Sequence, residues 1–376
     1  MKKMLLIGVL FASSLLALRA EDCISTNDNF SAVYCLPEPI KETHSSVNFE
    51  VLPQIELISI IQTISKYQTK YGFLMIQDTF LYQKEILKNF SSFRNHPVIQ
   101  MFDSLSLKPG KMNFSAPSSL MLYLDNNLNL RNDIIFDDFI IKRCGGIDSI
   151  KLFLNFLKDF SQKSSFNKFF KEHTDFYKRI ISLSIKSLGD NNIIQEIEEF
   201  YGLKQENYNV CLVSMYNFVG FGNSILHKNK KMELYNVIGP RSIEKDIPDF
   251  GDAYYLKYML RHEFSHPFVN TLTEENWNYI KDYSAKFETI PDVAKKRICG
   301  DWQECINEFV IRAVSVHLAY KENEELGQQV YDSEKSRGVY NLDDLLEHIR
   351  EYENNRNRYA TFGSYYKNIL DIFKKE

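Results

Sequence analysis

The chain has 376 residues, of which 44% are hydrophobic and 25% are charged, and its formal net charge is −4 at pH 7. This length and apolar content allow one large domain or two closely packed ones and exclude an intrinsically disordered chain. The acidic balance, with no basic cluster longer than the Lys228, Lys230 and Lys231 stretch, excludes a nucleic-acid-binding surface.

The first twenty residues have the pattern of a secretory signal peptide. Lys2 and Lys3 precede an uncharged apolar run from Leu5 to Leu18, and Ala20 supplies a small residue at the cleavage point. The run is shorter than the roughly 20 apolar residues that a membrane-spanning helix needs, and no later segment reaches that length. We therefore expect an exported chain, cleaved near Ala20, whose mature form has no membrane span.

The six cysteines are compatible with disulfide bonds in an exported protein. Cys23 and Cys35 are close in sequence, and so are Cys299 and Cys305. No Cys-x-x-Cys pair occurs, so a zinc site built from thiolates is not expected. Cys211 has apolar neighbours typical of a buried strand, which favours an inert thiol over a catalytic one.

Residues 21–206 are predicted to form a mainly helical region. An apolar helical face follows Pro53 and extends to Ile64, and residues 152–160 and 166–188 have amphipathic helical patterns. Lys108-Pro109-Gly110 predicts a turn.

Residues 207–376 are predicted to form a catalytic region with a small sheet ahead of its first long helix. Predicted strands are Tyr208–Met215 and Met232–Ile238, with a turn at Gly220–Asn223, and predicted helices are Gly251–His266, Trp302–Tyr320 and Leu342–Phe373. We expect a predominantly helical α+β fold whose catalytic region packs on the helical N-terminal region. The two regions are compatible with one compact unit.

The sequence His262-Glu263-Phe264-Ser265-His266 carries a His-Glu-x-x-His motif within a helical pattern. Four residues make slightly more than one helical turn, so the two histidines project from one face and can bind one zinc ion. Glu263 can then point at a metal-bound water and act as the general base. Two histidines packed on an ordinary helix are the alternative, but an apolar helix would bury these polar groups without partners.

A catalytic zinc site needs a third protein ligand, and no third histidine follows His266 closely. Pro267 is expected to kink or end the helix, because it lacks a backbone N–H, and so to release the chain toward a distant ligand. The predicted helix at 302–320 offers Glu304, Glu308 and His317 as that ligand.

The sequence resembles an uncharacterised family of exported bacterial proteins, a domain of unknown function grouped with gluzincin-type zinc metallopeptidases. The resemblance lies in Pro53-Gln54-Ile55-Glu56-Leu57, residues 208–240, His262–Asn270 and Asn307–Ala313. It implies a zincin-like domain with His262, His266 and Glu308 as zinc ligands and Glu263 as the base. It does not identify an oxyanion-stabilising group; Tyr283, Tyr359 and Tyr365 are candidates that are more simply explained as core or surface tyrosines.

Helix geometry also favours Glu308 as the third ligand. Glu304, Glu308 and Arg312 fall on one stripe of the predicted helix, and His317 falls on about the opposite face as a core histidine. A zinc ion and Arg312 would offset the repulsion between the two carboxylates, and Arg312 would hold the Glu308 carboxylate in place. In the alternative, the three residues form a solvated ion-pair face.

The sequence therefore predicts a secreted zinc metallopeptidase that acts on a peptide or protein substrate. In that case Met232–Ile238 is a candidate for the edge strand that pairs with an extended substrate. Two alternatives remain, namely a zinc-bearing binding protein without efficient turnover and a metal-dependent hydrolase of a non-peptide bond. An intact Glu263 disfavours the first, and no sequence feature distinguishes the second.

Overall fold

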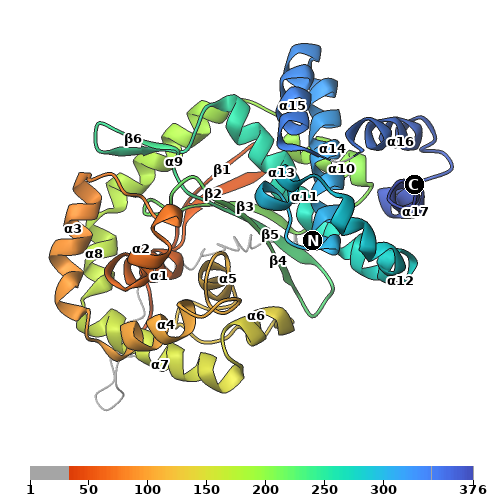
Figure 1. The fold of residues 1–376 in the computed structure, drawn as a ribbon. Helices are drawn as coiled ribbons and strands as arrows, with labels where there is room; N and C mark the ends of the chain where they lie inside the picture. The colour runs from red at the N-terminus through yellow and green to blue at the C-terminus, as the bar shows by residue number, and fades with distance from the viewer. Residues whose placement is uncertain (1–33, 340, 376) are drawn as a thin grey trace, which may run out of the picture.

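The computed structural model describes residues 34–339 and 341–375 and has an α+β fold in which helices predominate (Figure 1). The predicted fold class is confirmed at this level. The predicted signal peptide and Cys23 lie outside the described residues. Within the described part of the chain, no helix is both long enough and apolar enough to cross a membrane.

A five-stranded mixed sheet forms the centre of the fold, in the order β1-β2-β3-β5-β4. The strands are β1 (Ile40–His44), β2 (Val47–Val51), β3 (Asn207–Leu212), β4 (Gly220–Leu226) and β5 (Met232–Ile238). The β2–β3 and β3–β5 pairs are parallel, and the β1–β2 and β4–β5 pairs are antiparallel. The sheet thus joins strands from both sides of residue 206, and β1 and β4 form its edges. A separate hairpin contains β6 (Ser242–Glu244) and β7 (Ile247–Asp249).

The strands predicted at 208–215 and 232–238 are confirmed as β3 and β5. The turn predicted at Gly220–Asn223 is wrong, because these residues begin β4. The sequence pattern does not predict β1 or β2. The Val-Asn-Phe-Glu-Val sequence of β2 does alternate apolar and polar residues, but all five are buried, since Asn48 and Glu50 also lie inside the fold.

The helical character predicted for the N-terminal region is confirmed, with the first helix starting at Pro53. Its helices are α1 (Pro53–Ile64), α2 (Tyr67–Lys70), η1 (Gly72–Leu74), α3 (Leu81–Phe90), η2 (Ser91–Phe93), α4 (Pro97–Ser106), α5 (Ala116–Leu122), α6 (Asp138–Arg143), α7 (Ile147–Lys163), α8 (Phe166–Glu172), α9 (Thr174–Leu188) and α10 (Ile193–Tyr201). The predicted turn at Lys108-Pro109-Gly110 is also present, and Gly110 has a positive φ.

The C-terminal helices are more numerous than the sequence predicts. They are α11 (Ala253–Glu275), α12 (Trp277–Ile280), η3 (Lys281–Thr289), α13 (Asp292–Arg297), α14 (Trp302–Glu322), α15 (Glu324–Arg337), α16 (Leu342–Asn354) and α17 (Phe362–Ile372). The sequence did not predict four of them, namely α12, η3, α13 and α15, and the structure also differs from the prediction at Pro267 and in the last helix. Pro267 does not end α11, because its missing N–H removes one bond in a helix whose next residues, Phe268 and Val269, are buried in the core. The predicted helix at 342–373 is two helices, α16 and α17.

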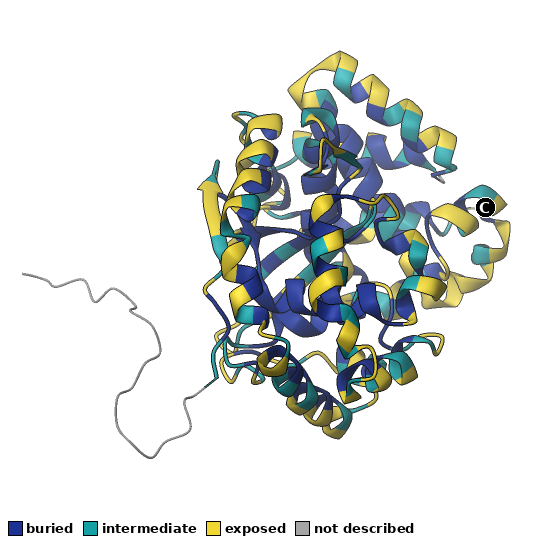
Figure 2. Ribbon diagram, turned by 90° about the vertical axis from the view of Figure 1, so that its left-hand side faces the viewer, coloured by how far each residue is buried: buried dark blue, intermediate teal, exposed yellow. Residues whose placement is uncertain are grey.

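Helices cover both faces of the sheet (Figure 1). Most of the N-terminal helices, coloured red to yellow, lie on one side, and the C-terminal helices, coloured teal to blue, lie on the other. The buried faces of the helices are turned inward and their exposed faces outward (Figure 2). On the C-terminal side α11 packs beneath the sheet, where the Phe264 ring meets the Tyr208 ring of β3 edge-on at 5.3 Å. The middle of α11, which carries the His-Glu-x-x-His motif, therefore packs directly against the sheet.

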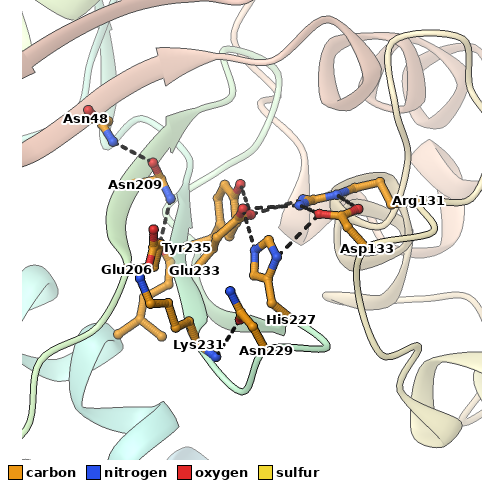
Figure 3. A network of polar contacts seen from close by, with 11 residues as sticks. Asn48, Arg131, Asp133, Glu206, Asn209, His227, Asn229, Lys231, Glu233 and Tyr235 are labelled. Carbon is orange, nitrogen blue, oxygen red and sulfur yellow. Dashed lines mark hydrogen bonds and ion pairs between the residues drawn. The ribbon is translucent and has the colours of Figure 1, made fainter.

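A polar network anchors the far end of the β4–β5 hairpin to the N-terminal region (Figure 3). Arg131 Nη1 lies 3.0 Å from Glu233 Oε2 of β5, and its Nη2 lies 2.8 Å from Asp133 Oδ2. His227 bridges the same two acids, with Nε2 2.7 Å from Glu233 and Nδ1 3.3 Å from Asp133. Tyr235 also donates a hydrogen bond to Glu233. Since Arg131 occupies the space between the acids, this cluster is a structural ion-pair network.

Candidate metal centre

Helix α11 presents its two histidines to one point in space. The helix begins at Asp252, whose side chain accepts a 2.9 Å hydrogen bond from the Tyr255 N–H and so caps the first turn. His262 and His266 are one turn apart, and their ring centroids are 5.0 Å apart. His262 is buried and His266 is half-buried. The motif is thus on a continuous, capped helix.

Helix α14 supplies Glu308 to the same point. The Cys299–Cys305 disulfide and the Asp301 cap fix the start of this helix. Glu308 Oε2 lies 3.6 Å from His262 Nε2, and Oε1 lies 3.5 Å from His266 Nε2. The ligand atoms of these three residues all lie within 4.8 Å of one another, and no other such group of acids, histidines or cysteines occurs in the described residues.

The donor set suits zinc, which binds imidazole nitrogens and carboxylate oxygens. His266 Nδ1 lies 3.4 Å from Asn270 Oδ1, and with the proton on Nδ1 this contact is a long hydrogen bond that leaves Nε2 free to bind a metal. Burial, with the charge of Arg312, lowers the pKa of His262 well below its ordinary value, which favours the neutral imidazole that a metal requires. Two histidines and a carboxylate held in this way fit a zinc ion.

Glu263 lies beside this group, in contact with strand β4. Its Oε2 is 3.8 Å from His266 Nε2, and its carboxylate accepts a hydrogen bond from the Gly222 N–H. Burial raises the pKa of Glu263 above its ordinary value. A Cβ on Gly222 would lie 2.8 Å from Glu263 Oε2, and one on Gly220 would lie 2.0 Å from Met259 Cε. The Met259 side chain can move away from Gly220, but a Cβ on Gly222 would also lie 2.9 Å from the Glu263 backbone carbonyl oxygen, so the close approach of strand and helix requires glycine at 222.

The edge of the sheet next to this site is β4, which corrects the prediction of Met232–Ile238 as the edge. That segment is β5, and it pairs with β3 on one side and β4 on the other. The Gly239 N–H donates to the Val219 carbonyl, and the His227 N–H donates to the Lys231 carbonyl. Odd-numbered residues therefore bond to β5, and Gly220, Gly222 and Ser224 turn their backbone groups to the outer edge.

Arg312 holds the Glu308 carboxylate through its Oε2 atom. Its Nε and Nη2 donate hydrogen bonds of 3.1 and 3.0 Å, both to Glu308 Oε2. Its Nη1 donates to Glu334 Oε2 at 2.9 Å and to the Tyr258 hydroxyl at 3.1 Å. The Tyr258 hydroxyl in turn donates to Glu334 Oε1 at 2.7 Å.

The structure brings together His262, Glu263, His266, Glu308 and Arg312 and leaves the other predicted candidates elsewhere. Glu304 accepts a hydrogen bond from the Gly300 N–H, ahead of its own helix. His317 is buried and lies 2.7 Å from Glu353 of α16. The three tyrosines considered for the oxyanion contact other groups: Tyr365 bonds to Glu351, Tyr359 packs on Tyr365, and Tyr283 lies near Lys374.

Sequence reasoning missed four residues of the site: Tyr258, Asn270, Gly222 and Glu334. The first two had a signal, because Tyr258 is four residues before His262 and Asn270 is four residues after His266, on the same helical stripe. No sequence signal pointed to Glu334, because only the packing of α15 on α14 brings it next to Arg312.

The comparisons with known proteins identify a family. The family described as "Domain of unknown function (DUF4932)" matches residues 47–372, which include the whole site and all of the sheet except β1. No curated protein and no solved structure matches the chain.

Proposed function

The chain belongs to the DUF4932 family, and we propose that it is an exported zinc-dependent metallopeptidase with a zincin-like catalytic domain. One observation supports the proposal most directly. The ligand atoms of His262, His266 and Glu308 lie within 4.8 Å of one another, beside the buried carboxylate of Glu263. His262, His266 and Glu308 would hold the ion. Glu263, which lies next to His262 in sequence but contacts β4, stays available for proton transfer.

The chemistry of the site divides between the ion and the chain. A bound zinc ion supplies a Lewis acid that polarises a carbonyl group and makes water more acidic. Glu263 accepts the proton of the attacking water and delivers it to the leaving amine. The Gly222 N–H orients the Glu263 carboxylate, and burial keeps bulk water from competing for it.

The outer edge of β4 supports a peptide as the substrate. An extended peptide can add to an exposed strand edge through main-chain hydrogen bonds. The outward backbone groups of Gly220 and Ser224 and the Gly222 carbonyl lie along the edge that contacts Glu263 through the Gly222 N–H. A peptide paired there would run past the carboxylate that we assign as the base. This favours peptide hydrolysis over hydrolysis of a non-peptide bond.

The alternative of a zinc-binding protein without turnover accounts less well for Glu263. The carboxylate is buried beside the two histidines, and two glycines make room for it. A binding site would gain nothing from this buried acid, whose burial has a free-energy cost. The arrangement therefore favours an enzyme.

The experiment combines metal analysis with digestion of a peptide library. We expect one zinc per chain, cleavage that a chelator abolishes, and recovery when zinc is added back. Glu263→Gln should keep its zinc and lose hydrolysis by about a hundredfold or more. Glu274→Gln, an exposed acid of the same helix, is the matched control and should behave as wild type. Protein that binds no zinc, or hydrolysis that survives in Glu263→Gln, would overturn the proposal.

A further inference from the structure

We propose that Glu334 is the positioning residue of the metal centre, because it holds two of the three ligands, Glu308 and His262, through two different side chains. Glu334 lies on α15, which contributes no ligand. The inference rests on the proposed function only in that it takes the three residues as zinc ligands. It predicts that zinc affinity depends on a residue that cannot touch the ion.

The first connection runs through Arg312 to Glu308. Arg312 Nε and Nη2 both donate hydrogen bonds to Glu308 Oε2, and Nη1 donates one to Glu334 Oε2. Its planar guanidinium fixes these directions relative to one another, which the single ammonium group of a lysine would not do. Glu308 Oε1, which lies 3.5 Å from His266 Nε2, is thereby turned toward His266, while Oε2 stays 3.6 Å from His262 Nε2. Glu334 thus sets the position of Arg312, and Arg312 sets the orientation of the Glu308 carboxylate.

The second connection runs through Tyr258 to His262. The Tyr258 ring is stacked on the His262 ring, with centroids 5.7 Å apart and planes 20° apart. The Tyr258 hydroxyl donates a hydrogen bond to Glu334 Oε1. A metal-bound histidine usually gives its other ring N–H to a carboxylate or a carbonyl, which fixes the ring. His266 has such a partner in Asn270, but buried His262 Nδ1 has none among the described residues. The stacked Tyr258 ring therefore takes over this orienting role for His262.

A carboxylate is the side chain that can serve both connections. Arg312 and Tyr258 both donate hydrogen bonds, and each uses a different oxygen of Glu334. Glutamine has one acceptor oxygen and an NH2 group, so it can accept from one of the two while presenting donors to the other. Glu334 is fully buried and Arg312 is nearly so. Removal of either charge would therefore leave the other buried without its counter-ion.

The test measures zinc affinity by competition with a chelator and the absorption spectrum of the cobalt-substituted protein. Glu334→Gln should weaken zinc binding about 10- to 100-fold, as substitutions of residues that orient metal ligands do, and should change the cobalt bands. Tyr258→Phe keeps the stacked ring and should lose less affinity. Glu56→Gln is the matched control, because Glu56 is also a buried carboxylate that accepts a hydrogen bond from a tyrosine, and should leave zinc affinity unchanged.

Separate measurements distinguish a positioning role from a purely structural one. The metal-free melting temperature shows whether each variant folds. If Glu334→Gln does not fold, it is replaced by Arg312→Lys, which keeps the positive charge but removes the planar set of donors. Folded variants with wild-type zinc affinity and cobalt spectra would overturn the inference while leaving the proposed function intact. Wild-type protein that binds no zinc would instead overturn the proposed function.

Discussion

Arg312 gives the two acids of the α14 stripe different roles, although both are glutamates one turn apart. Its hydrogen bonds end on Glu308 Oε2, which also lies near His262, and leave Oε1 directed toward His266. Glu304 instead turns back to the Gly300 N–H. At the scale of single residues, the choice of ligand thus follows from which carboxylate an arginine holds.

We expect zinc content to distinguish the three residues that the sequence offers as third ligand. Glu308→Ala should be purified without zinc, because it removes the carboxylate nearest the two histidines. Glu304→Ala and His317→Ala should retain one zinc per chain, since neither side chain contacts the group. Metal analysis of the three purified variants checks this. If Glu304→Ala alone lost its metal, the ligand would be one helical turn away from our assignment.

The residues of the site were predictable to the extent that they depend on local spacing. His262, Glu263 and His266 form a motif, and Glu308 with Arg312 form a one-turn pair, so periodicity alone places them on common faces. Gly220 and Gly222 were misread as a turn, because two nearby glycines mark a turn more often than a close approach. The latter role becomes visible only when α11 lies against β4.

At the scale of elements, the closest contact in the site is between β4 and α11. Gly222→Ala should reduce both hydrolysis and stability, because the new Cβ would lie 2.8 Å from Glu263 Oε2 and 2.9 Å from the Glu263 carbonyl oxygen. Overpacking of this kind costs about 1–3 kcal/mol of unfolding free energy. Ser224→Ala, at an exposed position of the same strand, is the control for stability and should leave the unfolding free energy unchanged. Equal denaturant midpoints for Gly222→Ala and wild type would contradict this prediction.

Element boundaries show where sequence signals were overridden. Pro267 predicted a break, but burial of the following turns keeps α11 continuous. β5 was predicted from its composition with correct bounds, yet its interior place in the sheet was not, since the order of strands depends on pairing with β3 and β4. Composition thus identified a strand, and only the tertiary structure identified which strand is the edge.

The whole molecule is held partly by ion pairs that make its stability depend on pH. Burial alone would raise the pKa of Glu353, but hydrogen bonds from His317 and Lys321 lower it from 4.5 to about 2. Because the folded pKa lies below the unfolded one, this contribution is complete above about pH 4.5 and is lost as the pH falls toward 2.

We therefore expect Glu353→Gln to lower the unfolding free energy near pH 6 and to flatten its decline between pH 4.5 and 2. Urea unfolding of metal-free protein across this range measures the effect without interference from ligand protonation. Glu347→Gln, an exposed position on the same helix, provides the control. An unchanged pH dependence in Glu353→Gln would show that the pair does not stabilise the fold.

The sheet also predicts that the two regions of the chain depend on each other. Separating residues 34–206 from 207–376 would remove the β2 partner of β3 and expose the β3 edge at Asn209, Val210 and Cys211. We expect neither fragment to unfold cooperatively and the second to aggregate. Thermal unfolding of the separately produced fragments tests this; a soluble 207–376 fragment with a sharp transition would contradict it.

The pairing of β2 with β3 has a consequence for how the chain folds. Asn48 of β2 donates a hydrogen bond to Asn209 of β3, 161 residues later. Contacts so distant in sequence raise the contact order and slow folding, because the entropy of closing the loop is lost before the pairing stabilises the chain. At ribosomal speeds of about 5–20 residues per second, β2 leaves the ribosome on the order of ten seconds before its partner exists. The helices between them have time to form before β2 pairs with β3.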